Sequence, residues 1–397
     1  MILMPAVDAN TPERWHCSQN PGVVLAVALA LAVVGPITFN ILPLLAAGAA
    51  HTLAFSDRQI GVMSFAISVG SGASALFAGM WVRSIQWPRA AALALGGMLT
   101  ANLLAMLVHR YWAFVLLQGA AGFFGSSVLC LAMTILSDRH EPARSFGVAV
   151  AMQAAYQVAA LLAGPTLLRV AGLNGVLAML AASSGLAMLL VPLLPPRGRS
   201  VMSTRVPAAL LNPGILIALL GCGSFFVNAG AYWTYVELMG QARGMTSRVV
   251  ANCVASGVSA GILGGVLAWV LGDRFGKLWP LGVATLMTVA AALLLNGSFT
   301  AGAFMLSVLL YYFAWNYSLA YQLAMINAVD ATGRGVAIAG VFGNLGAAGG
   351  AALAAVFVTP RDYSAVIWLA SVSVCLSTAL FILSSAVHRY ATASSNA

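Results

Sequence analysis

The sequence predicts an all-α integral membrane protein of about twelve transmembrane helices in two pseudo-symmetric six-helix bundles. Three observations lead to this fold class. The 397-residue chain is 61% hydrophobic and only 7% charged, whereas a soluble domain carries roughly 25% charged residues. Its apolar residues form runs that are long enough to cross a bilayer, which takes roughly 20 residues of helix. The pattern of these runs also falls on itself at an offset of 190 residues.

Twelve apolar runs follow one another along the chain with short connections. Residues 1–20 are polar and mixed in charge, and the run that follows them is longer than the roughly 7–15 apolar residues of a signal peptide. We therefore expect an uncleaved first transmembrane helix. The predicted spans are 22–48, 59–80, 89–108, 112–136, 146–169, 175–195, 214–238, 249–271, 279–297, 301–327, 335–358 and 364–387.

The longest connection lies at the middle of the chain and is interrupted by prolines. We therefore expect an N-terminal bundle (1–195), a cytoplasmic linker (196–213) and a C-terminal bundle (214–397). A shift of 190 residues places Arg58 on Arg248 and Arg144 on Arg334. Two six-helix halves related by a parallel repeat are the simplest explanation.

Basic residues outnumber acidic ones, 18 to 9. They are scattered singly between apolar runs, so they do not form the clustered basic face that a nucleic acid requires. With the N-terminus inside, twelve of them fall on the cytoplasmic side and six on the opposite side. The positive-inside rule then predicts cytoplasmic termini, and we expect a multi-pass protein of the bacterial inner membrane.

The chain shows no set of residues typical of a catalytic or metal site. Its five cysteines form no CxxC pair, and none of its five histidines lies well inside a span. HExxH and the phosphate-binding GxxxxGK[ST] pattern are absent, and the single GxSxG match, at residues 257–261, falls inside an apolar run. An enzyme would need a convergent set of such groups. We therefore expect neither an enzyme nor a bound cofactor or metal, and any driving force has to come from an ion or solute gradient.

The loop after the eighth span carries a recognisable motif. Residues 271–277 read LGDRFGK, which resembles the major facilitator loop signature G-x-x-x-D-R-x-G-R/K, although Trp269 replaces its first glycine. In the N-terminal copy, Arg83 replaces the acidic residue and Gln86 the second glycine. The motif and the twelve-span layout together resemble the major facilitator superfamily.

Three shorter fragments agree with this resemblance. Residues 56–61 are similar to the turn that opens the family's second helix. Gln118-Gly119 matches the end of the R-x-x-Q-G motif, whose arginine is replaced here by Val115. Gly164-Pro165 is similar to the start of a motif found in the family's antiporters, without its later glycines.

The resemblance implies a secondary transporter that works by alternating access on a small organic solute. Gly164-Pro165 favours export weakly, and an uptake symporter or a facilitator remains an alternative. A receptor or scaffold with a transporter-like fold is an alternative of another class. A proton gradient is a possible partner, and we expect a monomer in the lipid bilayer.

Uncharged polar and aromatic side chains are the candidates for a substrate site. The resemblance implies that the first, seventh and tenth spans line a central cavity. Tyr311 and Trp315 share one face of the tenth span with Ser318 and Gln322. The alternative for all these groups is hydrogen bonding between helices. The candidates are Asn40, Gln118, Gln153, Tyr156, Asn228, Tyr232, Tyr235, Tyr311, Trp315 and Asn316.

Charged residues suggest two further roles. Glu237 is the acid closest to the interior of a span, which makes it the candidate for proton coupling, although it can also be an interfacial charge. The resemblance further implies a cytoplasmic gate in which Asp273 lies near Arg144, and Arg83 near Asp330, when the protein is open to the outside. The gate residues are Arg83, Arg144, Asp273, Arg274 and Asp330.

Overall fold

The computed structural model describes residues 20–82, 84–138, 142–196, 213–272, 274–329, 334–359 and 362–395, almost all of them helical. The side chains of residues 79, 142–144, 334–337 and 390–395 lie outside the description. The helices are α1 (Pro21–Val34), α2 (Ile37–Asn40), α3 (Leu42–Leu53), α4 (Asp57–Trp81), α5 (Trp87–Leu107), α6 (Tyr111–Ser137), α7 (Pro142–Leu190), α8 (Pro213–Ala242), α9 (Ser247–Leu271), α10 (Leu278–Leu293), α11 (Ala301–Val329), α12 (Arg334–Phe357) and α13 (Ser364–Ser395), with a short 3₁₀ turn, η1 (Val191–Leu193).

These helices make about twelve passes, as the sequence predicts. Nine of the described helices are long and apolar enough to cross a membrane. The longest of them, α7, holds two passes, because the backbone turns sharply at Gly172 (φ 57°, ψ −151°). The short helices α1 to α3 together form the first pass, and α10 supplies the remaining one. The chain is therefore a multi-pass integral membrane protein.

The first pass is broken twice, whereas the sequence predicts one continuous span over 22–48. The helix is interrupted at Gly35-Pro36 and again at Ile41, two residues before Pro43. Gly35 lies where α1 meets α6, and a Cβ atom there would come within 2.7 Å of the Leu129 backbone nitrogen. Close packing against α6 therefore requires a glycine at the first break.

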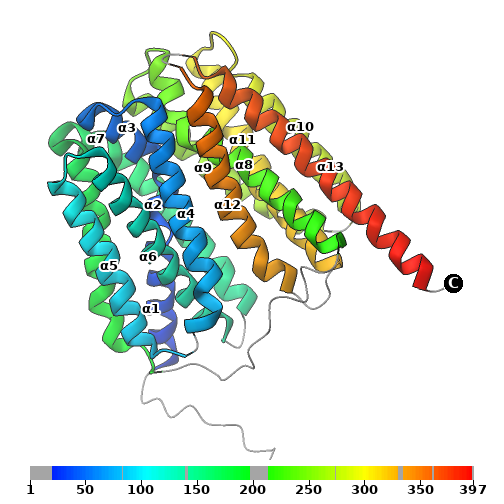
Figure 1. Cartoon of the computed structure of the whole chain (residues 1–397), viewed down its shortest axis with the longest axis horizontal. Coiled ribbons are helices and arrows are strands. Elements are labelled where there is room, and N and C mark those ends of the chain that lie inside the picture. Colours follow the sequence, from blue (N-terminus) through cyan, green and yellow to red (C-terminus); the bar gives the residue numbers. More distant parts are fainter. Residues whose placement is uncertain are drawn as a thin grey trace, which may run out of the picture.

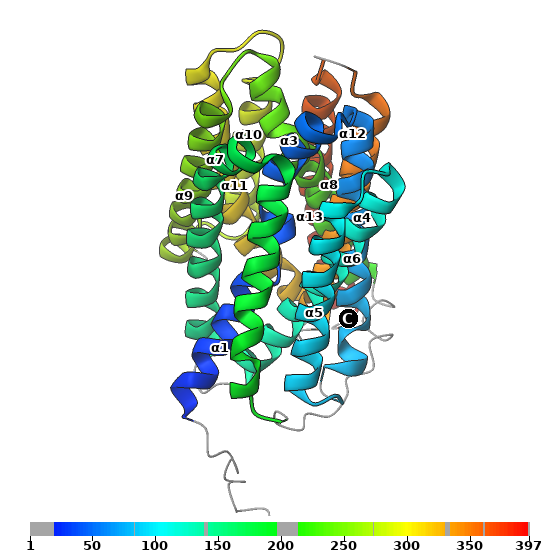
Figure 2. The same ribbon diagram turned by 90° about the vertical axis from the view of Figure 1, so that its left-hand side faces the viewer.

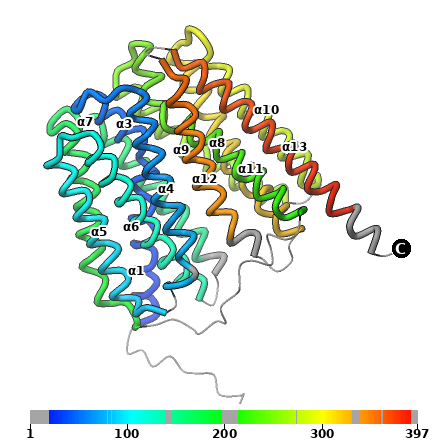
Figure 3. The backbone as a smooth tube through the Cα atoms, in the orientation of Figure 1, coloured from blue at the N-terminus to red at the C-terminus, as the bar shows by residue number. Residues whose placement is uncertain are grey.

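Two sets of helices lie side by side, α1 to α7 in one and α8 to α13 in the other (Figure 1). Within the second set, α8 packs along both α12 and α13, and α13 runs past the ends of its neighbours (Figure 3). The linker residues 197–212 lie outside the described residues, so the expected division at 196–213 stays a prediction.

Contacts between the two sets follow the 190-residue offset. The bounds of α4, 57–81, fall on those of α9, 247–271, and α12 falls within α7 at the same offset. The structure packs α4 against α12 and α9 against α7. The two interfaces are therefore equivalent under the repeat, and Figure 2 shows α7 and α9 as neighbours.

The chain alternates between two ends of the bundle. We call the end that holds residues 20, 84–86, 138 and 194–196 the terminal end, and the end that holds residues 54–56, 108–110, 243–246 and 358–359 the far end. In Figure 1 the terminal end is at the bottom and the far end at the top.

Candidate functional site

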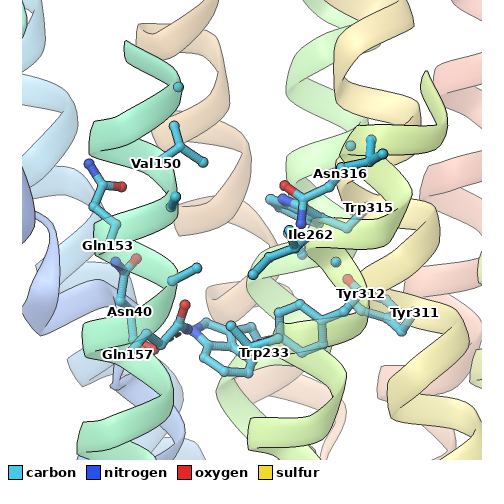
Figure 4. Close-up of a pocket in the computed structure, with 18 of the residues that line it drawn as sticks. Asn40, Val150, Gln153, Gln157, Trp233, Ile262, Tyr311, Tyr312, Trp315 and Asn316 are labelled. Carbon is cyan, nitrogen blue, oxygen red and sulfur yellow. Dashed lines mark hydrogen bonds between the residues drawn. The ribbon is translucent and has the colours of Figure 1, made fainter. Parts of the chain in front are cut away.

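A cavity of about 620 Å³ lies between the two sets of helices. The helices α2 and α7 supply one wall and α8, α9 and α11 the other (Figure 4). The lining residues are Phe39, Asn40, Phe146, Gly147, Val150, Ala151, Gln153, Ala154, Gln157, Ala229, Trp233, Val258, Gly261, Ile262, Gly265, Val266, Trp269, Tyr311, Tyr312, Trp315 and Asn316.

The cavity is closed towards the far end and open towards the terminal end. Trp233 and Tyr311, at its inner part, are 6% and 3% exposed. Val150, about two turns from the first residue of α7, is 44% exposed, and Trp269, two residues from the end of α9, is 83% exposed. Among the described lining residues, the inner part of the cavity is therefore closed and the part nearer the terminal end is accessible.

An aromatic wall comes from α8 and α11. Trp315 contacts Phe225 with ring centroids 4.9 Å apart, and Tyr312 meets the edge of Trp233 at 5.3 Å. Tyr311, which also lines the cavity, stacks on the buried Tyr232 at 3.8 Å. Aromatic pairs of this kind favour defined relative orientations, so the wall presents packed aromatic rings to the cavity.

An amide wall faces the aromatic one. Gln153 Nε2 on α7 donates to the Ala32 carbonyl at 2.9 Å, and Gln157 Nε2 donates to the Asn40 carbonyl at 2.7 Å. Each NH₂ group uses one of its two N–H bonds in this way, so one N–H and the side-chain oxygen of each glutamine remain for a ligand. Figure 4 shows the Gln153 oxygen on the cavity side. This wall therefore offers both hydrogen-bond acceptors and donors.

Half of the predicted substrate-site residues line this cavity, and the rest lie elsewhere. The lining residues are Asn40, Gln153, Tyr311, Trp315 and Asn316. The others are buried or partly buried between helices, namely Gln118, Tyr156, Asn228, Tyr232 and Tyr235.

Most of the residues away from the cavity make hydrogen bonds between helices. Tyr232 donates to or accepts from Ser307 Oγ at 3.0 Å, and Asn228 Oδ1 accepts from Tyr311 at 3.2 Å. The Tyr156 hydroxyl bonds to Ser183, and Tyr235 donates to the Asp57 carbonyl at 2.8 Å. This is the alternative role that polar groups within membrane helices can have.

Gln118 is also buried, and so are Ser318 and Gln322, which share the α11 face of Tyr311 and Trp315. Both side-chain polar atoms of Gln118 lack a partner among the described residues. Gln322 Nε2 donates to Ser318 Oγ at 2.8 Å, one helical turn away. The face that carries Tyr311 and Trp315 towards the cavity therefore turns into the helix packing nearer the terminal end.

Glu237 is buried at the far end, outside the cavity lining. It is 2% exposed, and Gln241 Nε2 donates to its carboxylate at 3.2 Å. The other end of the Gln241 amide bonds to His51 Nε2 of α3 at 2.9 Å. The carboxyl group is thus connected to a contact between the two sets of helices.

The predicted gate falls largely outside the described residues. Arg83, Asp273 and Asp330 are not described, and neither is the side chain of Arg144. Arg274 is exposed in the loop between α9 and α10. The gate therefore stays a prediction.

The cavity also contains residues that the sequence does not single out as candidates. Trp233 lies between Tyr232 and Tyr235 in the chain but on another face of α8, so it falls outside the stripe of Asn228, Tyr232 and Tyr235. Gly265 of α9 provides space, because a Cβ there would meet no atom within 4 Å, whereas Gly261 lets Asn316 approach, since a Cβ there would lie 2.4 Å from Asn316 Nδ2. Glycines four residues apart on one helix are the pattern that could have indicated this face of small residues.

Comparisons with known proteins agree with this architecture. The sequence model of the Major Facilitator Superfamily matches residues 27–351. None of the curated protein sequences compared with the chain matches it. The chain belongs to the Major Facilitator Superfamily. This membership places it among membrane transporters of small solutes, not among enzymes.

Solved structures share the fold at low sequence identity. A bacterial homologue of the human lysosomal transporter Spinster, in an inward-facing and unoccupied conformation, is 15% identical with a TM-score of 0.69, over 92% of this chain and 96% of that chain. The nucleoside transporter NupG is 14% identical with a TM-score of 0.72, over 91% of this chain and 98% of that chain. At this identity the likeness concerns the fold alone.

Proposed function

We propose that the protein is a secondary transporter that moves a neutral, zwitterionic or amphipathic organic solute by alternating access. The observation that supports this most directly is the cavity of about 620 Å³ between the two sets of helices, closed at one end and open at the other. Its volume is within the range of roughly 300–1,000 Å³ that small-molecule sites occupy.

The chemistry of the lining supports the proposed solute class. Among the residues that the structure describes, the lining includes aromatic rings and amides but no acidic, basic or histidine side chain. An ion without a partner is costly to bury away from water. A solute that is uncharged, or whose charges are balanced within the molecule, therefore suits this cavity better than a net ion.

Direction, coupling and location form the finer part of the proposal. We favour export across the bacterial inner membrane by a monomer, driven by a proton gradient through Glu237. In the structure Gly164 packs against Leu44 of α3, and Pro165 lies within α7. If the terminal end is cytoplasmic, as the basic residues predict, the cavity opens to the cytoplasm. Uptake or facilitated diffusion is the alternative.

The experiment starts from a thermal-shift screen of uncharged metabolites and drugs on the purified protein, followed by uptake of each hit into proteoliposomes. In the variant Gly265→Leu the new side chain enters the cavity, and its Cβ has no neighbour within 4 Å. We expect both the thermal shift and the transport to be lost while the melting temperature of the free protein stays the same.

Gly282→Leu is the matched control. Gly282 lies on α10, away from the cavity lining, and its Cβ would also meet no atom within 4 Å. This variant should bind and transport like the parent protein. Hits that bind but are never transported would instead support a receptor, and loss of binding in both variants would contradict the cavity as the site.

A further inference from the structure

Two prolines in the first pass remove hydrogen bonds that a continuous helix would make. In an α-helix the carbonyl of residue i accepts from the N–H of residue i+4, and proline has no N–H. Pro36 therefore cannot donate a hydrogen bond to the carbonyl of Ala32, and Pro43 cannot donate one to the carbonyl of Phe39. A backbone carbonyl left without a partner in the membrane interior is unfavourable.

Side chains that line the cavity take the place of both missing donors. Gln153 Nε2 of α7 reaches the Ala32 carbonyl at 2.9 Å. Trp233 Nε1 of α8 donates to the Phe39 carbonyl at 3.0 Å. The N–H of Ile41, which bonds to the Ile37 carbonyl, also donates to the Phe39 carbonyl. The first bond stays within the set α1 to α7, whereas the Trp233 bond joins the two sets of helices.

The Trp233 bond lies at the inner end of the cavity. Phe39 and Trp233 both line it, and Trp233 is 6% exposed with its ring against the edge of Tyr312. The amides of Gln153 and Gln157 line the same cavity and each bond to the first pass through one N–H. The indole N–H is thus the side-chain donor that occupies the Phe39 carbonyl at this cavity.

We propose that the transported solute is uncharged, carries an N–H or O–H donor beside a flat apolar ring, and replaces the indole of Trp233 at the Phe39 carbonyl. This inference rests on the proposed transport function. When the far end opens, α8 has to move away from the first pass and the Trp233 bond breaks. A solute that donates to the freed carbonyl offsets this loss, so its binding favours the opened conformation.

Three probes with one ring system test the ligand class by isothermal titration of the purified protein. Benzimidazole is uncharged with a ring N–H, 1-methylbenzimidazole lacks the donor, and 1,3-dimethylbenzimidazolium is a cation. We expect benzimidazole to bind about fivefold more tightly than its methylated form, as one net hydrogen bond allows, and the cation to bind least. Equal affinities, or no binding of benzimidazole, would overturn the proposal.

Two variants test the carbonyl itself. Trp233→Phe keeps an aromatic ring but removes the competing N–H, so the affinity for benzimidazole should rise relative to that for 1-methylbenzimidazole. Pro43→Ala supplies a backbone N–H to the Phe39 carbonyl, so the preference for the donor should disappear. Pro36→Ala acts in the same way on Ala32 and should preserve the preference, which makes it the control.

The outcomes separate this inference from the proposed transport function. A donor preference that disappears in Pro43→Ala supports the inference even if no solute crosses the membrane. Transport of a solute by a protein without donor preference overturns the inference and leaves the transport function standing. Melting temperatures of the three variants close to that of the parent protein show that the changes in affinity do not arise from unfolding.

Discussion

Trp315 connects the cavity to the packing of the second set of helices. One side of its ring lies on the cavity, and its other contacts are with Phe225, Phe226 and Tyr311, at centroid distances of 4.9, 5.2 and 6.4 Å. The residue is therefore part of the core as well as part of the cavity wall. A substitution there has to affect both binding and stability.

Trp315→Ala should weaken the binding of a solute found by the thermal-shift screen by about fivefold, since one aromatic contact contributes roughly 1 kcal/mol. It should also lower the melting temperature, because large-to-small substitutions in a packed core cost about 3–5 kcal/mol. Titration calorimetry and thermal unfolding measure the two effects.

The matched control is Trp269→Ala at the mouth of the cavity. Trp269 also lines the cavity but is 83% exposed, so its loss should leave the melting temperature unchanged. If Trp315→Ala binds as tightly as the parent protein, Trp315 does not belong to the substrate site.

For single residues, the sequence predicts which face of a helix carries a side chain but not whether that side chain reaches the cavity. Helical spacing predicts that Tyr311 and Trp315 share one face, and both line the cavity. The same reasoning predicts Tyr232 and Asn228 for the cavity, yet Tyr232 lies behind the ring of Tyr311 and Asn228 bonds to the Tyr311 hydroxyl. The tilt between α8 and α11 decides which ring covers which, and a single sequence does not contain it.

Between elements, a hydrogen bond between polar side chains joins α3 to α8 at the far end. His51 and Gln241 bond at 2.9 Å and are 190 residues apart. They are equivalent positions of the two halves under the predicted repeat, so a contact between them lies on the pseudo-twofold axis. Gln241 also holds Glu237, which makes this carboxyl group a direct neighbour of the axis.

Glu237→Gln keeps the shape of the side chain and removes its charge. If Glu237 couples transport to a proton gradient, the variant should lose gradient-driven accumulation in proteoliposomes and retain exchange of solute across them. Glutamine can still bond to Gln241, so the His51 contact and the melting temperature should be preserved. Accumulation at the parent level would show that Glu237 is not the coupling group.

The elements themselves could be predicted well from the sequence, with one clear exception. Apolar length locates the passes, because the bilayer sets it. The breaks in the first pass are missed, although Pro36 and Pro43 are visible in the sequence. Hydrophobicity runs through them without interruption, and prolines are tolerated in transmembrane helices when neighbours satisfy the freed carbonyls. The neighbours that do so here, Gln153 and Trp233, belong to distant parts of the chain.

For the whole molecule, we expect the interface of α4 with α12 to hold the far end of the cavity closed. At the far end, Tyr235 and Tyr363 both bond to Asp57, the first residue of α4. Gly61, one turn further along α4, packs directly against α12. The absolute direction of this closure in the membrane stays a prediction from the basic residues.

Gly61 allows the two helices to approach, and any side chain there would prevent it. A Cβ at Gly61 would overlap the Cβ of Ala355 and lie 2.9 Å from the Ala351 carbonyl, which is backbone and cannot move aside. Gly61→Ala, and more strongly Gly61→Leu, should therefore shift the protein towards a conformation that is open at the far end. The steric overlap should destabilise the closed conformation by roughly 1.4 kcal/mol. A free-energy change of that size shifts the equilibrium between the closed and open conformations tenfold.

A cysteine at position 241, in a background without native cysteines, reports this shift through its rate of labelling by a maleimide. Far-end opening separates α3 from α8 and exposes the position, so we expect the rate to rise about tenfold in Gly61→Leu and less in Gly61→Ala, since 1.4 kcal/mol corresponds to tenfold. Gly96→Leu on α5 is the control, because the nearest atom to a Cβ there is Met188 Cε at 4.0 Å. An unchanged rate in both Gly61 variants would mean that the α4–α12 contact does not hold the far end closed, and alternation would then have to depend on the equivalent contact between α7 and α9.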